Sequence, residues 1–520
     1  MRLNRTGNAK RNIVFGVLLN VYKMIMPFIL RTIMIYTLGV EYLGLGSLFA
    51  SILQVLNLAE LGVGSAMVYA MYRPIAEEDI ETTCAYLQLY KKYYFGIGAV
   101  IAVSGLAATP FVPHLIKGDI PENINVHILF LLNLAVTVNS YWGFAYRSSV
   151  ATAYQRVDLL NKIDIITLSA QCILQAIVLL LFRNYYFYTI AYVLAQIMNN
   201  MLIGIVMNKK FPQVIPKGVL KPEIVKETNR RIGALFTAKI GTVVVDSADT
   251  IVISAFLGLA ALAVYQNYFF IITTILAFVS IIFRACMAGI GNSIIVETKQ
   301  KNYADFELLT FIIIWIAGFC TACFLCLFQP FMEIWVGKDL MLSFPMVICF
   351  CIYYFVYEIN QLLNSYKDAA GIWQKDRFRP LVTALSNLAL NLLMVNKLGL
   401  FGILLSTILT MLFVGMPWLI HNLFSEVFDR DKMLPYVKKL LWYVGCVTGS
   451  SMATFLICGL VRLEGIGLLL SRAVLCCIIP NVCFLALFRS KPEFAQALQL
   501  ADIFTNGKLM KWLKKRGHSQ

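Results

Sequence analysis

Long apolar stretches recur along this sequence from one end to the other, and many run for about 20 residues with few charges. About 20 apolar residues of helix are needed to cross the ~30 Å hydrocarbon core of a bilayer. The stretches are continuous and do not alternate with polar residues, so they predict helices and not the strands of a barrel. We therefore predict an all-α, polytopic membrane protein, which the 59% hydrophobic and 14% charged composition supports.

Polar breaks divide the apolar stretches into about fourteen predicted transmembrane helices. Most of the 44 lysines and arginines lie in or beside alternate connections, so those connections are expected in the cytoplasm, together with both chain termini. This spread also explains the net charge of +16 without nucleic-acid binding. The intervening connections hold only Lys117, Arg183, Lys338, Lys397 and Arg462. The predicted spans lie near residues 13–38, 43–70, 86–112, 126–147, 161–182, 186–208, 235–258, 263–287, 307–330, 343–365, 380–397, 400–424, 439–461 and 465–488.

A short motif occurs twice, as "RTIMIYTLG" beginning at Arg31 and as "DTIVISAFLG" beginning at Asp249. Six predicted spans separate the copies, so both begin on the same side of the membrane and indicate a parallel repeat. The sequence therefore predicts two six-helix lobes followed by two extra helices. The predicted parts are an N-terminal lobe (1–208), a cytoplasmic linker rich in Lys, Arg and Pro (209–234), a C-terminal lobe (235–424), and two extra helices with a basic cytoplasmic tail (425–520).

The first predicted span carries two cations where lipid disfavours charge. Lys23, Pro27 and Arg31 are spaced at i, i+4 and i+8, so they share one helix face. Pro27 cannot donate a hydrogen bond to the carbonyl of Lys23, which leaves that carbonyl to be satisfied elsewhere. A charge at mid-membrane costs ~2.5–3.5 kcal/mol on insertion scales and usually faces the bundle interior. We expect this face to line a polar cavity; the alternative is that Arg31 reaches outward to the membrane surface.

The seventh predicted span carries Lys239, Asp246 and Asp249, which share one helix face. Two alternatives stay open for them: a role in transport, or ion pairs that hold the bundle together.

Three further charged residues are candidates. Glu60 has small neighbours that favour helix packing, and a packing or counter-ion role competes with proton coupling. Arg284 lies near the cytoplasmic end of its span, where it could anchor the helix or line a cavity. Glu358 lies among tyrosines, a surface suited to sugars but also common where helices pack. Nothing in the sequence explains the charge of Arg472 within the last predicted span.

The sequence predicts no cofactor and no metal site. Nearly all of the 13 cysteines lie within apolar spans, where they behave as small hydrophobic residues. Cys320, Cys323 and Cys326 have metal-like spacing, but no matching group of ligands occurs elsewhere in the sequence. No "GxxxxGK[ST]" stretch is present, so ATP hydrolysis is not expected.

With these features, the chain resembles the polysaccharide flippases of the Wzx type, in the multidrug/oligosaccharidyl-lipid/polysaccharide exporter superfamily. The resemblance spans essentially the whole chain. It is carried by "LGVEYLGLGSLFASILQVLNLAELGVGSAM" (38–67) and "DSADTIVISAFLGLAALAVYQNYFFI" (246–271). It implies two lobes around a central cavity that opens alternately to either side of the cytoplasmic membrane.

The resemblance also implies a substrate and its ligands. The cargo would be an undecaprenyl-diphosphate-linked oligosaccharide, with membrane lipid around it and glycosyltransferases and a polymerase as partner machinery. Lys23 and Arg31 match the cationic residues that hold the pyrophosphate, Arg284 less closely, and Asp249 matches an acid common in the seventh span. The predicted substrate-binding residues are Lys23, Arg31, Arg284, Lys239 and Asp249, and the predicted ion-coupling residues are Glu60, Asp246 and Glu358.

Two other functions compete with the flippase. A multidrug or cation antiporter of the same superfamily is the first alternative, although the cationic face of the first span disfavours cationic drugs. A polysaccharide polymerase or ligase is the second. Such enzymes need a large external loop, and the longest external connection here is short, near 113–125. We therefore predict a transporter and not an enzyme.

Overall fold

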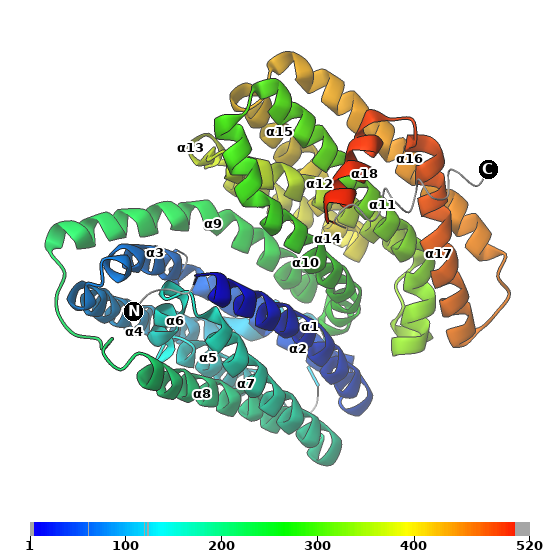
Figure 1. The fold of residues 1–520 in the computed structure, drawn as a ribbon. Coiled ribbons are helices and arrows are strands. Elements are labelled where there is room, and N and C mark those ends of the chain that lie inside the picture. Colours follow the sequence, from blue (N-terminus) through cyan, green and yellow to red (C-terminus); the bar gives the residue numbers. More distant parts are fainter. Residues whose placement is uncertain (1–4, 61, 119, 122–123, 505–520) are drawn as a thin grey trace. The chain divides into compact units, whose positions relative to one another are not determined.

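The structure, a computed structural model, describes residues 5–504 except 61, 119, 122 and 123. The described residues form helices joined by short connections, with no strand among them (Figure 1), which confirms the predicted all-α class. The α-helices are α1 (Arg5–Thr37), α2 (Val40–Leu56), α3 (Val63–Ala76), α4 (Ile80–Ala108), α5 (Val126–Asn139), α6 (Ser148–Ala153), α7 (Val157–Ile177), α8 (Tyr185–Lys210), α9 (Pro222–Leu257), α10 (Leu259–Val296), α11 (Lys299–Val336), α12 (Phe344–Ala369), α13 (Trp373–Asp376), α14 (Arg379–Thr410), α15 (Met416–Glu426), α16 (Met433–Gly459), α17 (Gly465–Phe488) and α18 (Pro492–Phe504).

Ten helical segments among the described residues are long and apolar enough to cross a membrane, so this is a multi-pass membrane protein. One of them, Trp373–Glu426, covers the two predicted spans 380–397 and 400–424, and Gly399 interrupts the helical backbone between them. Three shorter apolar helices, Val40–Leu56, Val126–Asn139 and Ser247–Leu257, coincide with three further predicted spans. The number of fourteen crossings stays a prediction.

Polar caps and glycines set the helix ends. Asp79 caps α4 by accepting a hydrogen bond from the Thr82 backbone N–H at 2.9 Å, and hydrogen bonds from Thr82 lower the pKa of Asp79. The predicted span 43–70 is broken between α2 and α3. Residues Asn57–Glu60 form a 3₁₀ turn there, and Gly62 takes the left-handed conformation with φ 90°.

The two copies of the repeated motif fold alike at their glycines. Gly39 follows α1 with φ 113° and ψ 170°, and Gly258 follows α9 with φ 92° and ψ 174°. A side chain would be strained at these positive φ values, so glycine lets the next helix begin at the following residue in both copies. The sequence repeat thus corresponds to a repeated helix–glycine–helix corner.

The described residues pack as two compact units. Within the described residues, the first comprises residues 5–267 and Leu388–Leu400, and the second comprises Tyr268–Asn387 and residues 401–504. The helix α9 begins at Pro222, inside the predicted linker, and packs within the first unit. The predicted division of the chain at residues 208, 234 and 424 stays a prediction.

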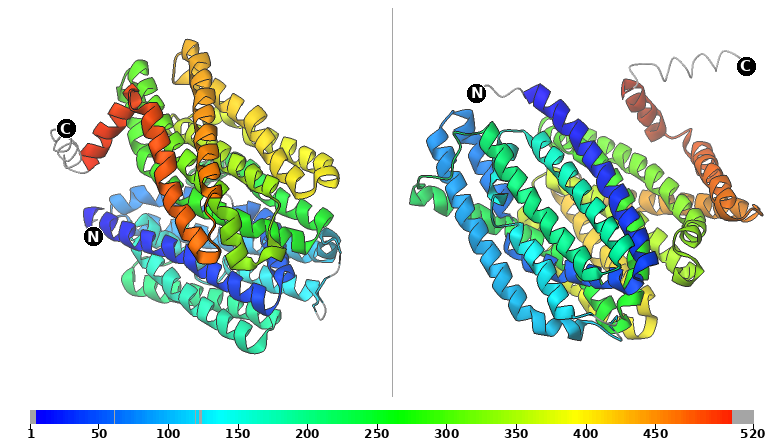
Figure 2. Two further views of the ribbon diagram at one scale, coloured as in Figure 1. Left: turned by 90° about the vertical axis from the view of Figure 1, so that its right-hand side faces the viewer. Right: turned by 90° about the horizontal axis from the view of Figure 1, so that it is seen from below.

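Within the first unit, α1, α7 and α8 lie side by side in that order, with α5 beyond α8 (Figures 1 and 2). Its largest buried cluster gathers apolar side chains of α3, α4, α6, α7 and α8. Because α7 separates α1 from α8, a polar residue on the inner face of α1 meets the polar residues of α7.

Within the second unit, α11 packs against α12, α16 and α17. Aromatic rings fill its core, with Phe306 of α11 in contact with Tyr366, Phe424, Phe428 and Tyr436. These large buried side chains make α11 the central helix of that unit.

Each unit also holds a buried carboxylate in a bidentate pair with an arginine. Arg156 binds both oxygens of Asp158, at 2.8 and 3.2 Å, where α7 begins. Arg379 binds both oxygens of Asp376, at 2.7 and 2.8 Å, where α14 begins. Both aspartates are buried, with 0% and 3% of their surface exposed. Such pairs fix geometry because the planar guanidinium matches the carboxylate.

Candidate functional site

Lys23 on α1 faces an acidic partner on α7. Its Nζ lies 3.8 Å from Oδ2 of Asp164, and the two side chains are 54% and 37% exposed. Asn199 of α8 donates to the other carboxylate oxygen of Asp164 at 3.2 Å and to the Thr167 hydroxyl at 3.0 Å. The three helices therefore hold a half-exposed cation beside an anchored carboxylate.

Arg31, two turns further along α1, has a partner in the first turns of α10. Its Nη1 donates to Oδ1 of Asn267 at 2.9 Å, and the side chain is partly buried. Asn267 is completely buried, and its Nδ2 donates no hydrogen bond among the described residues. The guanidinium thus engages a neighbouring helix, while its position relative to the membrane surface stays a prediction. A buried donor lies beside it.

Between these two cations, α1 continues through Pro27 without interruption. On the same helix, the Tyr22 hydroxyl lies 2.7 Å from the Ser169 hydroxyl of α7. Tyr22 and Lys23 of α1 thus meet a hydroxyl and a carboxylate of α7. We name Lys23, Arg31, Asp164 and Asn267 the α1 polar site.

Asp249 on α9 lies in a second polar contact within the first unit. Its Oδ1 accepts a hydrogen bond from Nδ2 of Asn391 on α14 at 2.6 Å. The next residue, Thr250, accepts one from Gln266 of α10 at 3.1 Å. Asp249 is therefore an acceptor held by an amide. The side chains of Lys239 and Asp246, on the same helix, lie outside the described residues, and their roles stay predictions.

Glu60 lies at the break between α2 and α3, next to tyrosine hydroxyls of α4. A Cβ atom placed on Gly64 would lie 3.0 Å from Oε1 of Glu60 and 3.1 Å from the hydroxyl of Tyr90. Tyr90 donates to Tyr94 at 2.6 Å, and the rings are 4.3 Å apart between centroids. The absence of a side chain on Gly64 thus leaves room for a carboxylate beside a pair of tyrosines.

Arg284 and Glu358 both lie in the second unit. Arg284 is exposed on α10, and Glu358 is buried on α12 with 1% of its surface exposed. Neither Oε1 of Glu358 nor the hydroxyl of Tyr354, one turn away, makes a hydrogen bond among the described residues. The two residues are not members of the α1 polar site, and their roles in binding or coupling stay predictions.

A mainly apolar groove of about 550 Å³ lies in the first unit between α3, α4 and α9. Tyr93 of α4 donates to Asn229 of α9 at 2.6 Å across it. Its lining includes Lys92, Ile97, Val100, Ile232 and Phe236. One cationic and many apolar side chains make the groove suitable for a hydrocarbon chain that ends in an anionic group.

The α9–α10 corner of the first unit is closed by tight backbone contacts. Lys117 donates its backbone N–H to the carbonyl of Ser254 at 3.0 Å, and the Ser254 hydroxyl donates to the carbonyl of Leu115 at 2.7 Å. Helix α2 approaches so closely that a Cβ atom on Gly44 would lie 2.2 Å from the carbonyl oxygen of Leu259. Glycine at position 44 is what permits this approach. The corner lies on the side that the loop charges predict to be external.

The sequence did not predict the partners of three predicted site residues. Asp164, Asn267 and Asn391 each contact a predicted residue from a distant helix. Asp164 does carry a usable signal, because it is a charge within the predicted span 161–182. The two asparagines carry none, since buried amides are ordinary in helical bundles.

The fold is similar to that of several solved transporters. A lipid II flippase, MurJ, in an inward closed conformation, aligns with a TM-score of 0.63 and 15% identity, over 92% of this chain and 99% of MurJ. An inward-facing multidrug resistance transporter of the MATE family, which belongs to the MOP superfamily, aligns with a TM-score of 0.62 and 14% identity, over 81% of this chain and 99% of its own. The Vibrio cholerae MATE transporter VcmN aligns with a TM-score of 0.55 and 17% identity, over 81% and 98% of the two chains. No protein-family model and no curated protein matches the sequence.

Proposed function

We propose that this protein is a flippase that moves an undecaprenyl-diphosphate-linked oligosaccharide across the cytoplasmic membrane by alternating access, for polysaccharide biosynthesis. The fold, shared over nearly the whole chain with flippase and multidrug transporters, supports transport. The α1 polar site supports the choice of an anionic substrate.

The observation that carries this proposal is the environment of Arg31. A fixed guanidinium and the buried, orphaned Nδ2 of Asn267 present donors in one place. A diphosphate that leaves water needs such donors, since an unpaired anion in hydrocarbon is prohibitively costly. Lys23 adds a second cation two turns away on the same face. The guanidinium fork suits phosphate oxygens better than an ammonium would.

The apolar part of the substrate needs a separate path. The groove between α3, α4 and α9 offers a mainly apolar wall that includes Lys92. In the proposed mechanism the prenyl chain lies in this groove or in the surrounding lipid. The sugars cross through a water-filled path while the protein changes from its inward-open to its outward-open state. Opening of the α9–α10 corner would expose the polar site to the outside.

A multidrug or cation antiporter is the second candidate, and a specific observation favours it. Glu60 lies beside Tyr90 and Tyr94, and an acid among aromatic rings suits an organic cation. Asp164 likewise places a carboxylate next to Lys23. The carboxylates Glu60, Asp246 and Glu358 would then serve as ion-coupling groups.

Transport by the purified full-length chain in proteoliposomes separates the two candidates. One arm follows a prenyl-diphosphate-linked oligosaccharide with a fluorophore that an impermeant reductant quenches from outside. The other arm follows ethidium under imposed proton and sodium gradients. Flipping of the lipid without ethidium transport supports the flippase. Ethidium exchange without lipid flipping would establish the antiporter and reject our proposal.

A further inference from the structure

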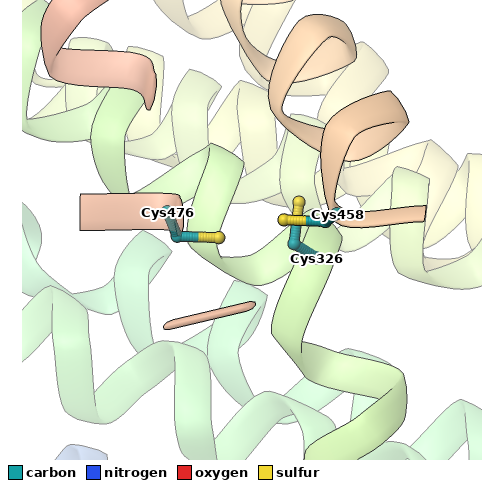
Figure 3. A group of neighbouring side chains, drawn as sticks. All are labelled: Cys326, Cys458 and Cys476. Carbon is teal, nitrogen blue, oxygen red and sulfur yellow. The ribbon is translucent and has the colours of Figure 1, made fainter. Parts of the chain in front are cut away.

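Three cysteines from three helices of the second unit meet inside the protein. Cys326 of α11, Cys458 of α16 and Cys476 of α17 are buried, with at most 1% of each residue exposed. Their sulfur atoms all lie within 4.8 Å of one another. Figure 3 shows Cys476 directing its sulfur toward the other two.

The spacing of these sulfurs suits a single bound metal ion. Zinc binds thiolate sulfur at ~2.3 Å, so the sulfurs around one ion lie about 3.8–4.0 Å apart. The observed group needs only small side-chain adjustments to reach that arrangement. Cys323 packs against the same three residues, which brings a fourth thiol close to the group.

Arg472 gives an independent indication that an anion belongs here. It precedes Cys476 by one turn on α17, and its Nη1 lies 3.5 Å from the carbonyl oxygen of Cys326. Its Nε is buried and makes no hydrogen bond among the described residues. A guanidinium nitrogen withdrawn from solvent favours an anion nearby, and three neutral thiols do not supply one.

We propose that Cys326, Cys458 and Cys476 form a binding site for a thiophilic d¹⁰ cation, Zn²⁺ or Cu⁺, with Arg472 as its counter-charge. Soft thiolate ligands select these ions. Binding of Zn²⁺ to three thiols releases three protons to the solvent and leaves a net charge of −1 on the complex. Arg472 then makes the site neutral, whereas Cu⁺ would leave one negative charge uncompensated. The charge balance therefore favours Zn²⁺.

The site would tie α16 and α17 to the central helix α11. The surrounding side chains are apolar, with Leu327, Phe455 and Leu475 packed against the sulfurs. Such a shell excludes water and strengthens metal–thiolate bonds. The competing explanation is that the cysteines merely fill space as small hydrophobic residues.

Metal content of the purified full-length protein tests the proposal. Chains prepared in detergent with reductant are freed of metal, titrated separately with Zn²⁺, Cd²⁺ and Cu⁺, and the bound metal is counted by mass spectrometry. Thiolate-to-cadmium charge-transfer absorption reports sulfur ligation directly. We expect one metal per chain. C326S and C476S should each weaken binding at least tenfold, and R472Q should weaken it less.

Two cysteines provide matched controls. Cys351 is buried in the same unit, and Cys477 is the exposed neighbour of Cys476. C351S and C477S should bind as the wild type does. Absence of metal from the wild type would overturn the proposal. Metal binding by C326S and C476S as tight as that of the wild type would also overturn it. A disulfide between any two of the three cysteines in the reduced preparation would do so as well.

The change in melting temperature on adding metal tests the proposal even if a serine variant folds poorly. Added Cd²⁺ should raise the melting temperature of the wild type and of C477S. It should leave that of C458A unchanged, whatever its starting value. An equal rise in C458A would show that the metal binds elsewhere.

Discussion

Arg31 of α1 and Asn267 of α10 are joined by a 2.9 Å hydrogen bond across 236 residues of sequence. The bond places a guanidinium at the buried side-chain amide of Asn267, whose nitrogen Nδ2 has no hydrogen-bond acceptor among the described residues. The pair thus combines a fixed charge with a donor that is left without a partner, which is what an anionic headgroup would use.

Replacing Arg31 tests its role in binding the headgroup. We expect Arg31→Ala to reduce lipid flipping about tenfold to hundredfold, since a hydrogen bond to a charged group is worth about 1.5–3 kcal/mol. Arg31→Lys should retain part of the activity, because it keeps the charge and loses the planar fork. Flipping rates in proteoliposomes are the measurement.

Arg73→Ala is the matched control, because the Arg73 side chain is 87% exposed and pairs with Glu77 at the end of its own helix at 2.8 Å. It should flip lipid at the wild-type rate. Unchanged flipping by a well-folded Arg31→Ala protein would remove Arg31 from the mechanism.

The sequence predicts the helices well, because apolar length is a local property. The repeated Leu-Gly positions are local too, and Gly39 and Gly258 indeed share one conformation. The break between α2 and α3 was missed, although Asn57 and Gly62 are residues that favour turns.

The partners of the charged residues could not be predicted, because they depend on which helices pack together. Lys23 meets Asp164, and Asp249 meets Asn391, through tertiary contacts that no spacing along the chain encodes. The group formed by Cys326, Cys458 and Cys476 could not be predicted for the same reason, since it depends on the packing of three helices. Cys326 has two other cysteines on its own helix, yet the group of thiols within 4.8 Å of one another includes one from α16 and one from α17.

Asp164 should lower the affinity of Lys23 for an anionic substrate, because its carboxylate competes with the substrate for the ammonium group. Neutralising it with Asp164→Asn is expected to lower the KM for the lipid substrate up to about fivefold, because a partly exposed ion pair is worth about 0.2–1 kcal/mol. Lys23→Ala should raise the KM. The substrate dependence of flipping measures both. A higher KM in Asp164→Asn would show that Asp164 positions Lys23 productively and does not compete with the substrate.

The buried pair of Asp376 and Arg379 should stabilise the second unit. Asp376→Ala leaves Arg379 and the nearby Lys367 without this carboxylate, and breaking such a pair costs about 3–5 kcal/mol. Asp305→Ala is the control, since Asp305 pairs with Lys301 at 2.7 Å and the two side chains are 37% and 56% exposed. Its loss should cost under about 1 kcal/mol. Denaturation in detergent compares the two, and equal losses would argue against the buried pair.

The predicted orientation in the membrane rests on the loop charges. A cysteine at Lys117 should react with an impermeant thiol reagent added to intact cells, and a cysteine at Lys217 should react only after the membrane is opened. Both positions are exposed in the structure. The exposed Cys477 is first replaced by serine to lower the background. The opposite labelling pattern would invert the topology.

The close approach of α2 to α10 should be sensitive to a single methyl group. Gly44→Ala places a Cβ atom 2.2 Å from the carbonyl oxygen of Leu259, a distance that backbone atoms cannot accommodate without moving. Overpacking of this kind costs about 1–3 kcal/mol. We therefore expect a lower melting temperature. A cysteine that replaces Lys117 should also react faster with the impermeant thiol reagent, because position 117 is part of the α9–α10 corner and this corner should open. Gly445→Ala, in α16, is the control. No atom lies within 4 Å of its new Cβ, so it should melt no lower than the wild type. If Gly44→Ala melts as Gly445→Ala does and the thiol at Lys117 reacts no faster, the corner is looser than the contact implies, and glycine is not required there.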